Sequence, residues 1–272
     1  MKKLIFALIL LFINISFGQD TIRLTEVVVV KPYKKDYGKI IKKIRKTLKN
    51  NFEAKERYYR VNEISICDEK DTLLHIDALF NFNIKSLESD FTKDLVINDD
   101  NKVFRNELFF NKYSEYRDSP EFWISSIMFR KSLDVLGFDF FKNYSKYEIE
   151  ISYEKDIIYV KFQSKEMYSG YLICDSKNYN LKKLYFKNPS EYPFSASHSD
   201  NGKKKGLKTW DYLIETTTVE FNTNNSNMIY IKNFTSNEVK TNYFYEKYDK
   251  KGEIVFQEGP FKFNSTVSIS EL

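Results

Sequence analysis

The stretch that decides the fold is residues 56–84, ERYYRVNEISICDEKDTLLHIDALFNFNI. In its second half apolar and polar residues alternate, so the apolar side chains from Leu74 to Ile84 fall on one face of an extended chain. The run before it also has strand character, and the polar residues Asp68 to Asp71 separate the two. This pattern predicts a hairpin of two antiparallel strands, the second of them long and half-buried.

Period-two patterning continues through the second half of the chain. YEIEISYE (147–154) and IIYVKFQ (157–163) each place apolar side chains on one face, with a short turn between them. Five further strand-like runs follow: SGYLICD (169–175), LKKLYF (181–186), TWDYLIETTTVEF (209–221), NMIYIKNFTSNEVKTNYFYEKY (227–248) and EIVFQEGPFKF (253–263). The segment 195–208, SASHSDNGKKKGLK, is predicted to be the one long polar loop.

Two segments have helical patterning instead. In the first, near residues 37–50, Asp36 can cap the helix and the apolar residues share one face: Tyr37, Ile40, Ile41, Ile44 and Leu48. The second is predicted near residues 120–136, because Ser119, Pro120 and Glu121 form a helix-start signal. Many strands and few helices predict an α+β fold, in which a large antiparallel sheet packs against one or two helices.

Residues 1–18, MKKLIFALILLFINISFG, have the pattern of an export signal that is cleaved near Gly18. The apolar stretch is shorter than the roughly 20 residues of a membrane-spanning helix, and no comparable stretch occurs later. The expected product is a protein of the periplasm or the secreted fraction. Residues 19–35 would form a connector strand, and residues 36–272 a single domain.

Charge restricts the partners. The chain has 43 Lys and Arg against 38 Asp and Glu, and loss of Lys2 and Lys3 with the leader lowers the formal net charge from +5 to +3. The positive charge is concentrated in residues 31–49, where it can meet acidic headgroups or glycans, or can simply be a solvated helix face. Export argues against nucleic acid as a partner.

The two cysteines, Cys67 and Cys174, both occur in the string Ile-Cys-Asp at the end of an apolar run. They can pair as a disulfide, which would stabilise the fold by about 4 to 5 kcal/mol in the chain-entropy model. They can also be two separate buried thiols that behave as small apolar side chains. The sequence leaves both interpretations open.

No catalytic constellation, metal site or cofactor site is evident, so an enzymatic role is not predicted. The chain has no G-x-S-x-G string, and its two histidines and two cysteines lack zinc-ligand spacing. The string Ser197-His198-Ser199-Asp200 is read as polar surface, and His75 as a polar-face strand residue. Glu148 and Glu150 share a strand face, where they form either a hydrolase pair or a solvent-exposed surface.

A resemblance adds to this interpretation. The string Leu24-Thr-Glu-Val-Val-Val29, the helix around Ile40, Asn50-Asn51-Phe52 and Tyr58-Tyr59-Arg60 resemble a group of exported Gram-negative envelope proteins. Those proteins begin with a carboxypeptidase-regulatory-like β-domain that ends in a similar string, followed by a helix and a large sheet. The resemblance implies a member without that domain, in which Val27 to Val30 form the connector strand.

The strands from YEIEISYE to LKKLYF look like those of lipoprotein-carrier-like half-barrels. That resemblance implies a curved, half-barrel-like sheet wrapped around helices, with acyl chains carried in an apolar concavity. No individual binding residue of those carriers can be matched to this chain.

Two functions remain open. The first is a non-enzymatic envelope protein that binds a lipid-like or other hydrophobic ligand in the concavity of the sheet. Its candidate lining, which can equally be packed core, is Phe122, Trp123, Ile127 and Met128. The second is a surface module that recognises glycan or an outer-membrane partner protein, and its candidate residues are Tyr230, Tyr243 and Tyr245.

Overall fold

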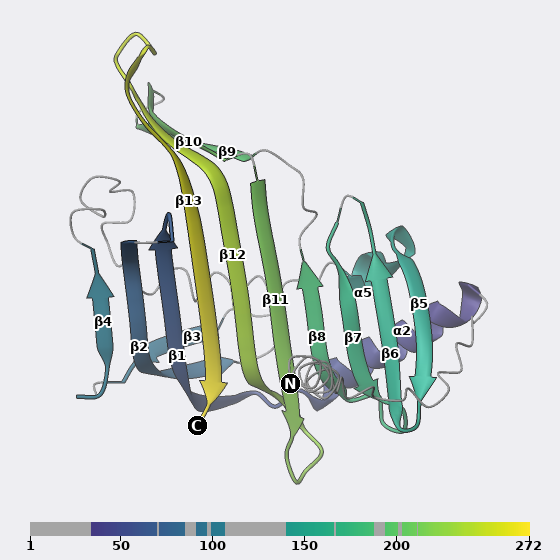
Figure 1. Ribbon diagram of the computed structural model, residues 1–272. Coiled ribbons are helices and arrows are strands. Elements are labelled where there is room, and N and C mark those ends of the chain that lie inside the picture. The colour runs from purple at the N-terminus through teal and green to yellow at the C-terminus, as the bar shows by residue number, and fades with distance from the viewer. Residues whose placement is uncertain are drawn as a thin grey trace, which may run out of the picture.

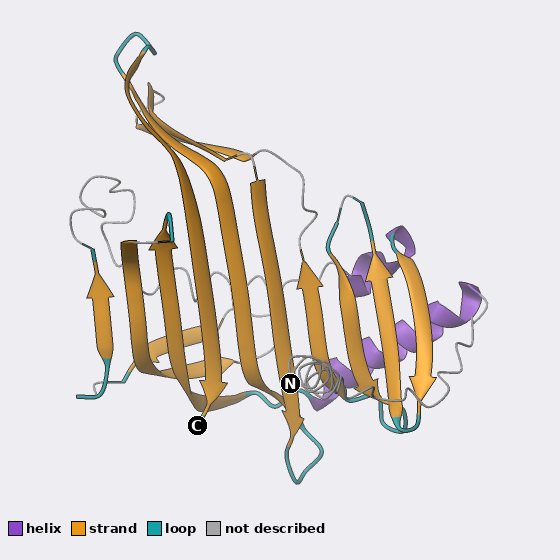
Figure 2. Cartoon of the chain, in the orientation of Figure 1, coloured by secondary structure: helices purple, strands orange, loops and turns teal. Residues whose placement is uncertain are grey.

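The computed structural model describes residues 34–69, 71–84, 91–96, 99–106, 140–165, 167–187, 194–200, 203–210 and 212–272. They form one 13-stranded antiparallel sheet with helices on one side (Figures 1 and 2). The helical elements are α2 (Lys34–Asn51), the single turn α5 (Phe140–Asn143) and the 3-10 turn η3 (Tyr144–Lys146). The prediction of a large antiparallel sheet with few helices is confirmed at this level.

The strands in chain order are β1 (Lys55–Cys67), β2 (Asp71–Ile84), β3 (Phe91–Leu95), β4 (Lys102–Arg105), β5 (Glu148–Glu154), β6 (Ile157–Gln163), β7 (Ser169–Asp175), β8 (Leu181–Lys187), β9 (Phe194–Asp200), β10 (Lys203–Trp210), β11 (Tyr212–Thr223), β12 (Ile229–Tyr248) and β13 (Ile254–Glu271). Their order across the sheet is β3-β2-β1-β13-β12-β11-β8-β7-β6-β5, while β4 pairs with β2 and β10 pairs with β12. The first and last strands therefore lie side by side. Figure 1 shows an open, curved sheet whose long strands β12 and β13 extend beyond their neighbours.

The hairpin predicted from residues 56–84 is confirmed. Strands β1 and β2 pair antiparallel from Lys55 opposite Ile84 to Cys67 opposite Asp71. Alternate residues of β2 are buried, with exposed fractions of 0–3%: Leu74, Ile76, Ala78, Phe80, Phe82 and Ile84. Because side chains alternate across a strand, this apolar set points to the side of the sheet on which the helices lie, and the intervening residues point to the other side.

Helix α2 packs against the concave side of the sheet, behind β5–β8 in Figure 1. Its residues Ile41, Ile44 and Leu48 are 0–3% exposed and belong to the core that these strands form. At its end, Asn51 donates a hydrogen bond to Asn180 at 3.1 Å. Each such buried aliphatic side chain contributes about 1.5–3 kcal/mol, so packing holds the helix in place. The predicted apolar face of this helix is confirmed.

The predicted loop at residues 195–208 is wrong. Strands β9 and β10 occupy most of it, pairing from Lys203 opposite Asp200 to Trp210 opposite Phe194. Strand β10 also pairs with the far part of β12, between Gly206 and Thr209. Tertiary pairing thus outweighs the polar composition of the segment. The sequence did contain a signal, because Asn201-Gly202 is a favoured connection for two-residue hairpins.

Several sequence predictions lie outside the described residues: the leader 1–18, the connector strand as far as residue 33, and the helix at 120–136. They remain predictions. Residues 34 and 35, which the connector was expected to include, belong to α2.

The structure contradicts a disulfide between Cys67 and Cys174, because both are buried thiols that form no disulfide. Cys67 ends β1 and Cys174 lies in β7, with β13, β12, β11 and β8 between them. Five strand spacings of about 4.8 Å amount to about 24 Å. A disulfide needs Cα atoms within roughly 7 Å. The interpretation as two separate buried thiols fits the structure.

We expect both thiols to be unreactive toward Ellman's reagent in the native protein at pH 8. Burial raises the pKa of each to about 12, which suppresses the reactive thiolate. After unfolding in guanidinium chloride without reductant, thiol titration should find both cysteines. A disulfide would instead leave no titratable thiol until reductant is added.

The same groups make stability depend on pH. In the unfolded chain the thiols ionise near pH 8.5, whereas the native thiols remain protonated there. Because the native pKa of each thiol lies above its value in the unfolded chain, the protonated thiols stabilise the native state fully below about pH 8.5. The stabilisation is lost as the pH rises above that value. The free energy of unfolding, measured with urea, should therefore fall with increasing pH, and it should fall less steeply in Cys174→Ala.

Candidate functional site

One row of apolar side chains crosses the concave face of the sheet on nine neighbouring strands. Cross-strand pairing aligns Ala78, Val61, Ile269, Phe234, Val219, Leu184, Leu172, Val160 and Ile151. Each is at most 2% exposed. Near the β5–β8 end, Phe140 of α5 stacks on Phe162 with ring centroids 4.3 Å apart. Helices α2 and α5 therefore make this end of the concave face packed core.

Beside this row, among the residues that the structure describes, the strands of the concave face carry buried polar groups on β1 and β11–β13. This inner polar band consists of Glu63, Ser65, Glu215, Thr217, Ser236, Glu238 and Ser265. The hydroxyl groups of Thr217 and Ser236 lie 3.0 Å apart, and those of Ser65 and Ser265 lie 2.9 Å apart. Glu63 and Glu215 are buried. The concave face is thus amphipathic at this end, not wholly apolar.

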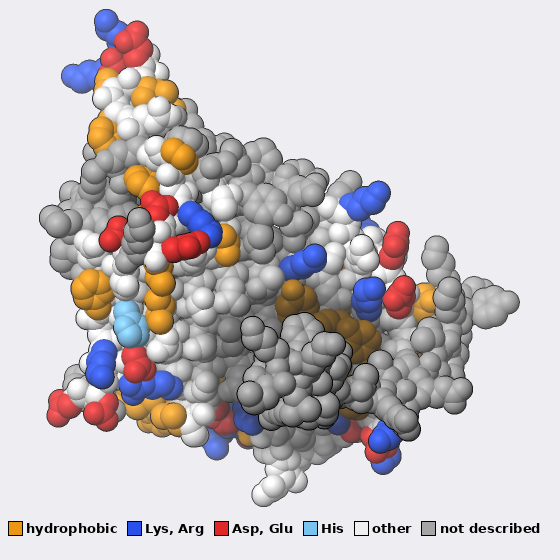
Figure 3. Space-filling model, in the orientation of Figure 1, with side chains coloured by type: hydrophobic (Ala, Val, Ile, Leu, Met, Phe, Trp, Pro, Cys, Tyr) orange, Lys and Arg blue, Asp and Glu red, His pale blue; other side chains and the backbone are white. Residues whose placement is uncertain are grey.

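The outer face of the same strands carries a row of uncharged polar side chains, which we call the neutral track. Direct cross-strand pairing aligns Asn62, Ser268, Thr235, Thr218, Tyr185 and Tyr171 on six strands. At a strand spacing of about 4.8 Å the track is about 24 Å long. Figure 3 looks onto this face, and the middle of β12 and β13 is mainly white there, the colour of the backbone and of side chains that are neither charged nor hydrophobic.

The rows on either side of the neutral track on β11–β13 are also polar. Their members are Thr216, Asn237 and Thr266 on one side, and Glu220, Asn233 and Ser270 on the other. Glu220 is the single charged residue among these six. Since 30% of the whole chain is charged, the outer face departs here from the Lys- and Glu-rich surface that the composition leads one to expect.

Several hydroxyl groups of the track are not used within the protein. In the part of the chain that the structure describes, the side chains of Ser268, Thr235 and Thr218 make no hydrogen bond to another protein group. The neighbouring Thr266, by contrast, donates to Asn237 Oδ1 at 2.9 Å. Each hydroxyl can donate one hydrogen bond and accept two, so the track keeps its full bonding capacity for other molecules.

Three tyrosines form a stack at one end of the track. The rings of Tyr171 and Tyr185 lie with centroids 5.2 Å apart and planes 25° apart, and Tyr159 stacks on Tyr171 at 5.1 Å. All three are half-buried. Burial and the neighbouring Tyr171 raise the pKa of Tyr159. The centroid separation is close to one strand spacing, so each ring stacks on the tyrosine of the neighbouring strand.

Ion pairs close the neutral track at both ends. Beyond Asn62, Arg60 pairs with Asp77, and that hydrogen bond holds the pKa of the Asp77 carboxyl below its usual value. Beyond Tyr171, Lys161 lies 3.7 Å from Glu150. Each end of the track is therefore bordered by an ion pair, whose two charges have opposite sign.

Glu220, the charged residue of these rows on β11–β13, is also paired. It accepts hydrogen bonds from Asn233 and Lys183, each at 3.1 Å. These two bonds hold the pKa of Glu220 below its usual value. Little net charge therefore faces the middle of the outer surface.

A different cluster, at the end of the sheet, has a structural role. Arg57 of β1 forms ion pairs with Glu53, which precedes β1, and with Glu271 at the end of β13. Its guanidinium lies over the ring of Tyr230, 3.8 Å from the centroid. Burial alone lowers the pKa of Arg57, but the charges of Glu271 and Glu53 outweigh it and raise the pKa. This cluster ties β1, β12 and β13 together.

The predicted site residues fall in several places. The candidate ligand lining, Phe122, Trp123, Ile127 and Met128, lies outside the described residues and stays a prediction. The ring of Tyr230 is occupied by Arg57, and its hydroxyl accepts a hydrogen bond from Asn222 at 3.0 Å. The side chains of Tyr243 and Tyr245 are not described.

The remaining polar candidates lie apart from one another. His75 is on the outer face of β2, opposite Phe104 of β4. Ser197 to Asp200 belong to β9. Glu148 and Glu150 are exposed on β5. Within the described ranges no three metal-ligating side chains gather, and no helix has the length and apolar character to cross a membrane.

Sequence reasoning missed the neutral track. The alternation that predicts strands also defines the outward set, for example Thr216 and Thr218 in β11, or Thr266, Ser268 and Ser270 in β13. That signal shows short uncharged residues on separate strands. It does not show that β13, β12, β11 and β8 are neighbours, which is what aligns the residues.

Comparisons with known proteins add little to this geometry. No protein-family model and no curated protein matches the chain. The chain is similar to the solved complex of MucA and MucB from Pseudomonas aeruginosa, with 8% identity and a TM-score of 0.26, covering 87% of this chain and 94% of the other. A structure of MucB in complex with MucA(peri) gives 6% identity, a TM-score of 0.23, and coverage of 86% and 92%. At these TM-scores the likeness carries no argument about fold, location or partner.

Replacing Arg57 should destabilise the protein strongly. Arg57→Ala removes both ion pairs and leaves two carboxylates without their cation, at a cost of about 3 kcal/mol. Arg60→Ala is the matched control, because that residue lies on the opposite face of β1 in a more exposed pair with Asp77. Its cost should be about 0–1 kcal/mol. Equal losses in urea unfolding would contradict the assigned role of Arg57.

Proposed function

We propose that the protein is a non-enzymatic exported envelope protein that acts as a recognition module, with the outer face of its sheet as the binding surface. The observation that carries the proposal is the neutral track, together with the polar rows beside it on β11–β13. Export is the expectation from the leader sequence, residues 1–18.

The side chains of the track suit a binding surface better than a surface that contacts only water. Its side chains are short and uncharged over β11–β13, so a partner can approach the sheet closely without displacing long lysine or glutamate side chains. Its unused hydroxyl groups can donate and accept hydrogen bonds, and the stacked tyrosines supply apolar area with a polar tip. A charged or apolar partner would find few complementary groups along this row.

A charge placed in the track should weaken binding strongly. Thr218→Lys puts an unpaired ammonium group in the middle of the row, so binding of the mature chain to envelope fragments of the bacterium that encodes it should fall by about tenfold or more. Thr223→Lys is the matched control, because it adds the same charge at the exposed end of the same strand.

Co-sedimentation over a range of protein concentrations would measure both variants, after circular dichroism has shown that they fold. Full binding by Thr218→Lys, or equal losses in the two variants, would rule out the track as the recognition surface. Absence of binding by the unaltered chain would rule out the recognition function in that envelope.

A second candidate is suggested by the inner polar band. Apolar rows with buried hydroxyl and carboxyl groups beside them suit an amphiphile whose head group meets the band. The proposed lining for its apolar part is Phe122, Trp123, Ile127 and Met128, as expected from the sequence. The apolar residues of β1 and β11–β13 belong to the same buried core as those of β5–β8, so such a ligand would have to replace part of the packing over β1 and β11–β13.

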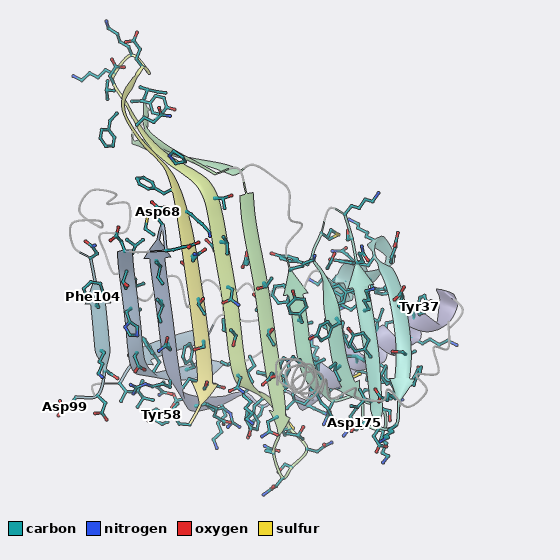
Figure 4. All side chains as sticks on the ribbon, viewed as in Figure 1. Tyr37, Tyr58, Asp68, Asp99, Phe104 and Asp175 are labelled. Carbon is teal, nitrogen blue, oxygen red and sulfur yellow. The ribbon has the colours of Figure 1, made fainter. Side chains whose placement is uncertain are left out.

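The test of this second candidate is native mass spectrometry with lipid extraction on the mature chain, purified without detergent. A stoichiometric acyl-containing adduct is expected, and Trp123→Glu in a folded protein should lose it. Phe104→Glu is the control, because Phe104 is 50% exposed on β4 and labelled at the sheet edge in Figure 4. A clean mass without any adduct would reject the carrier function.

A further inference from the structure

The neutral track has a shape as well as a composition. Ser268, Thr235 and Thr218 are short side chains on adjacent strands, and the next residue in the row is Tyr185. The track is therefore a shallow floor that ends at a tall aromatic side chain. Tyr171 stacks on one face of the Tyr185 ring, from the β7 side. The opposite face of the ring is on the side of β11, where Thr218 is the cross-strand neighbour of Tyr185.

This combination selects a particular ligand chemistry. A floor of hydroxyl groups without protein partners offers donors and acceptors at a spacing of about 4.8 Å, the distance between strands. The face of an aromatic ring carries negative charge and attracts C–H groups, which are slightly positive. A molecule with hydroxyl groups on its edges and C–H groups on its ring faces satisfies both.

The electrostatics favour an uncharged ligand. No charged side chain belongs to the track, and three ion pairs lie around it: Arg60 with Asp77, Lys161 with Glu150, and Lys183 with Glu220. One exposed cation, Lys187, lies opposite Thr216 in the row beside the track. Along Ser268, Thr235 and Thr218 themselves, an anionic ligand would give up water without an ion pair in return.

We propose that the neutral track binds an uncharged polysaccharide chain, laid across β13, β12 and β11 with one sugar ring against the face of Tyr185. This assignment rests on the proposed recognition function and names its ligand class. The chain runs perpendicular to the strands, so successive sugar units meet Ser268, Thr235 and Thr218 in turn. Tyr185 fixes the register of the first unit, and Tyr171 supports its ring from behind.

The test uses isothermal titration calorimetry on the folded mature chain with linear uncharged hexasaccharides of glucose and mannose. An anionic hexasaccharide of galacturonic acid serves as comparator. Binding of at least one neutral oligosaccharide is expected, with no binding of the anionic one. Tyr185→Ala should weaken that binding by about tenfold or more, since it removes one aromatic contact and the wall of the floor.

Tyr58→Ala is the matched control. Tyr58 is 53% exposed on the outer face of β1, outside the track, and Figure 4 labels it near the end of that strand. Its loss should leave oligosaccharide affinity unchanged. Equal weakening in the two variants, or unchanged affinity in Tyr185→Ala, would overturn the assigned site.

The outcomes separate this inference from the recognition function. If envelope binding is lost in Thr218→Lys but no neutral oligosaccharide binds, the glycan assignment fails and the recognition surface stands, with a protein as the remaining partner class. Preferential binding of the anionic oligosaccharide also overturns the assignment. If neither envelope fragments nor oligosaccharides bind, both proposals fail together.

Discussion

The pairing of β1 with β13 is the contact on which the rest of the structure depends. It joins residues about 200 positions apart, such as Ser65 and Ser265, and places the N-terminal hairpin beside the last strand of the chain. Only then do the inward apolar residues of β1 and β2 line up with those of β11–β13. Such a contact closes a very long loop, so it forms at a high entropic cost that the continuous core must offset.

The same pairing builds both faces of the sheet at once. Because neighbouring side chains in a strand point to opposite sides, the register that buries Val61 and Ile269 also sets Asn62 beside Ser268 outside. A slip of one residue would turn apolar groups to solvent and hydroxyl groups into the core. The hydrophobic core therefore fixes the register of the neutral track, although the track contributes little to that core.

Local signals predicted a large part of the fold. The β1–β2 hairpin and the apolar face of α2 follow from alternation and from the 3.6-residue period, which act over a few residues. The polar composition of the segment that forms β9 and β10 predicted a loop. That prediction was wrong, because β10 pairs with β12, which is distant in the sequence. The cysteines show the same limit, since identical local strings ended on two strands that have four others between them.

The sequence by itself determined which residues of each strand share a face, and thus that Thr218, Thr235 and Ser268 point away from the core. Only the tertiary structure decided that these residues form one line leading to Tyr185 and Tyr171. The physical reason is that alternation is a property of one strand. Strand order depends on long-range burial and hydrogen bonding summed over the whole sheet, which no local pattern encodes.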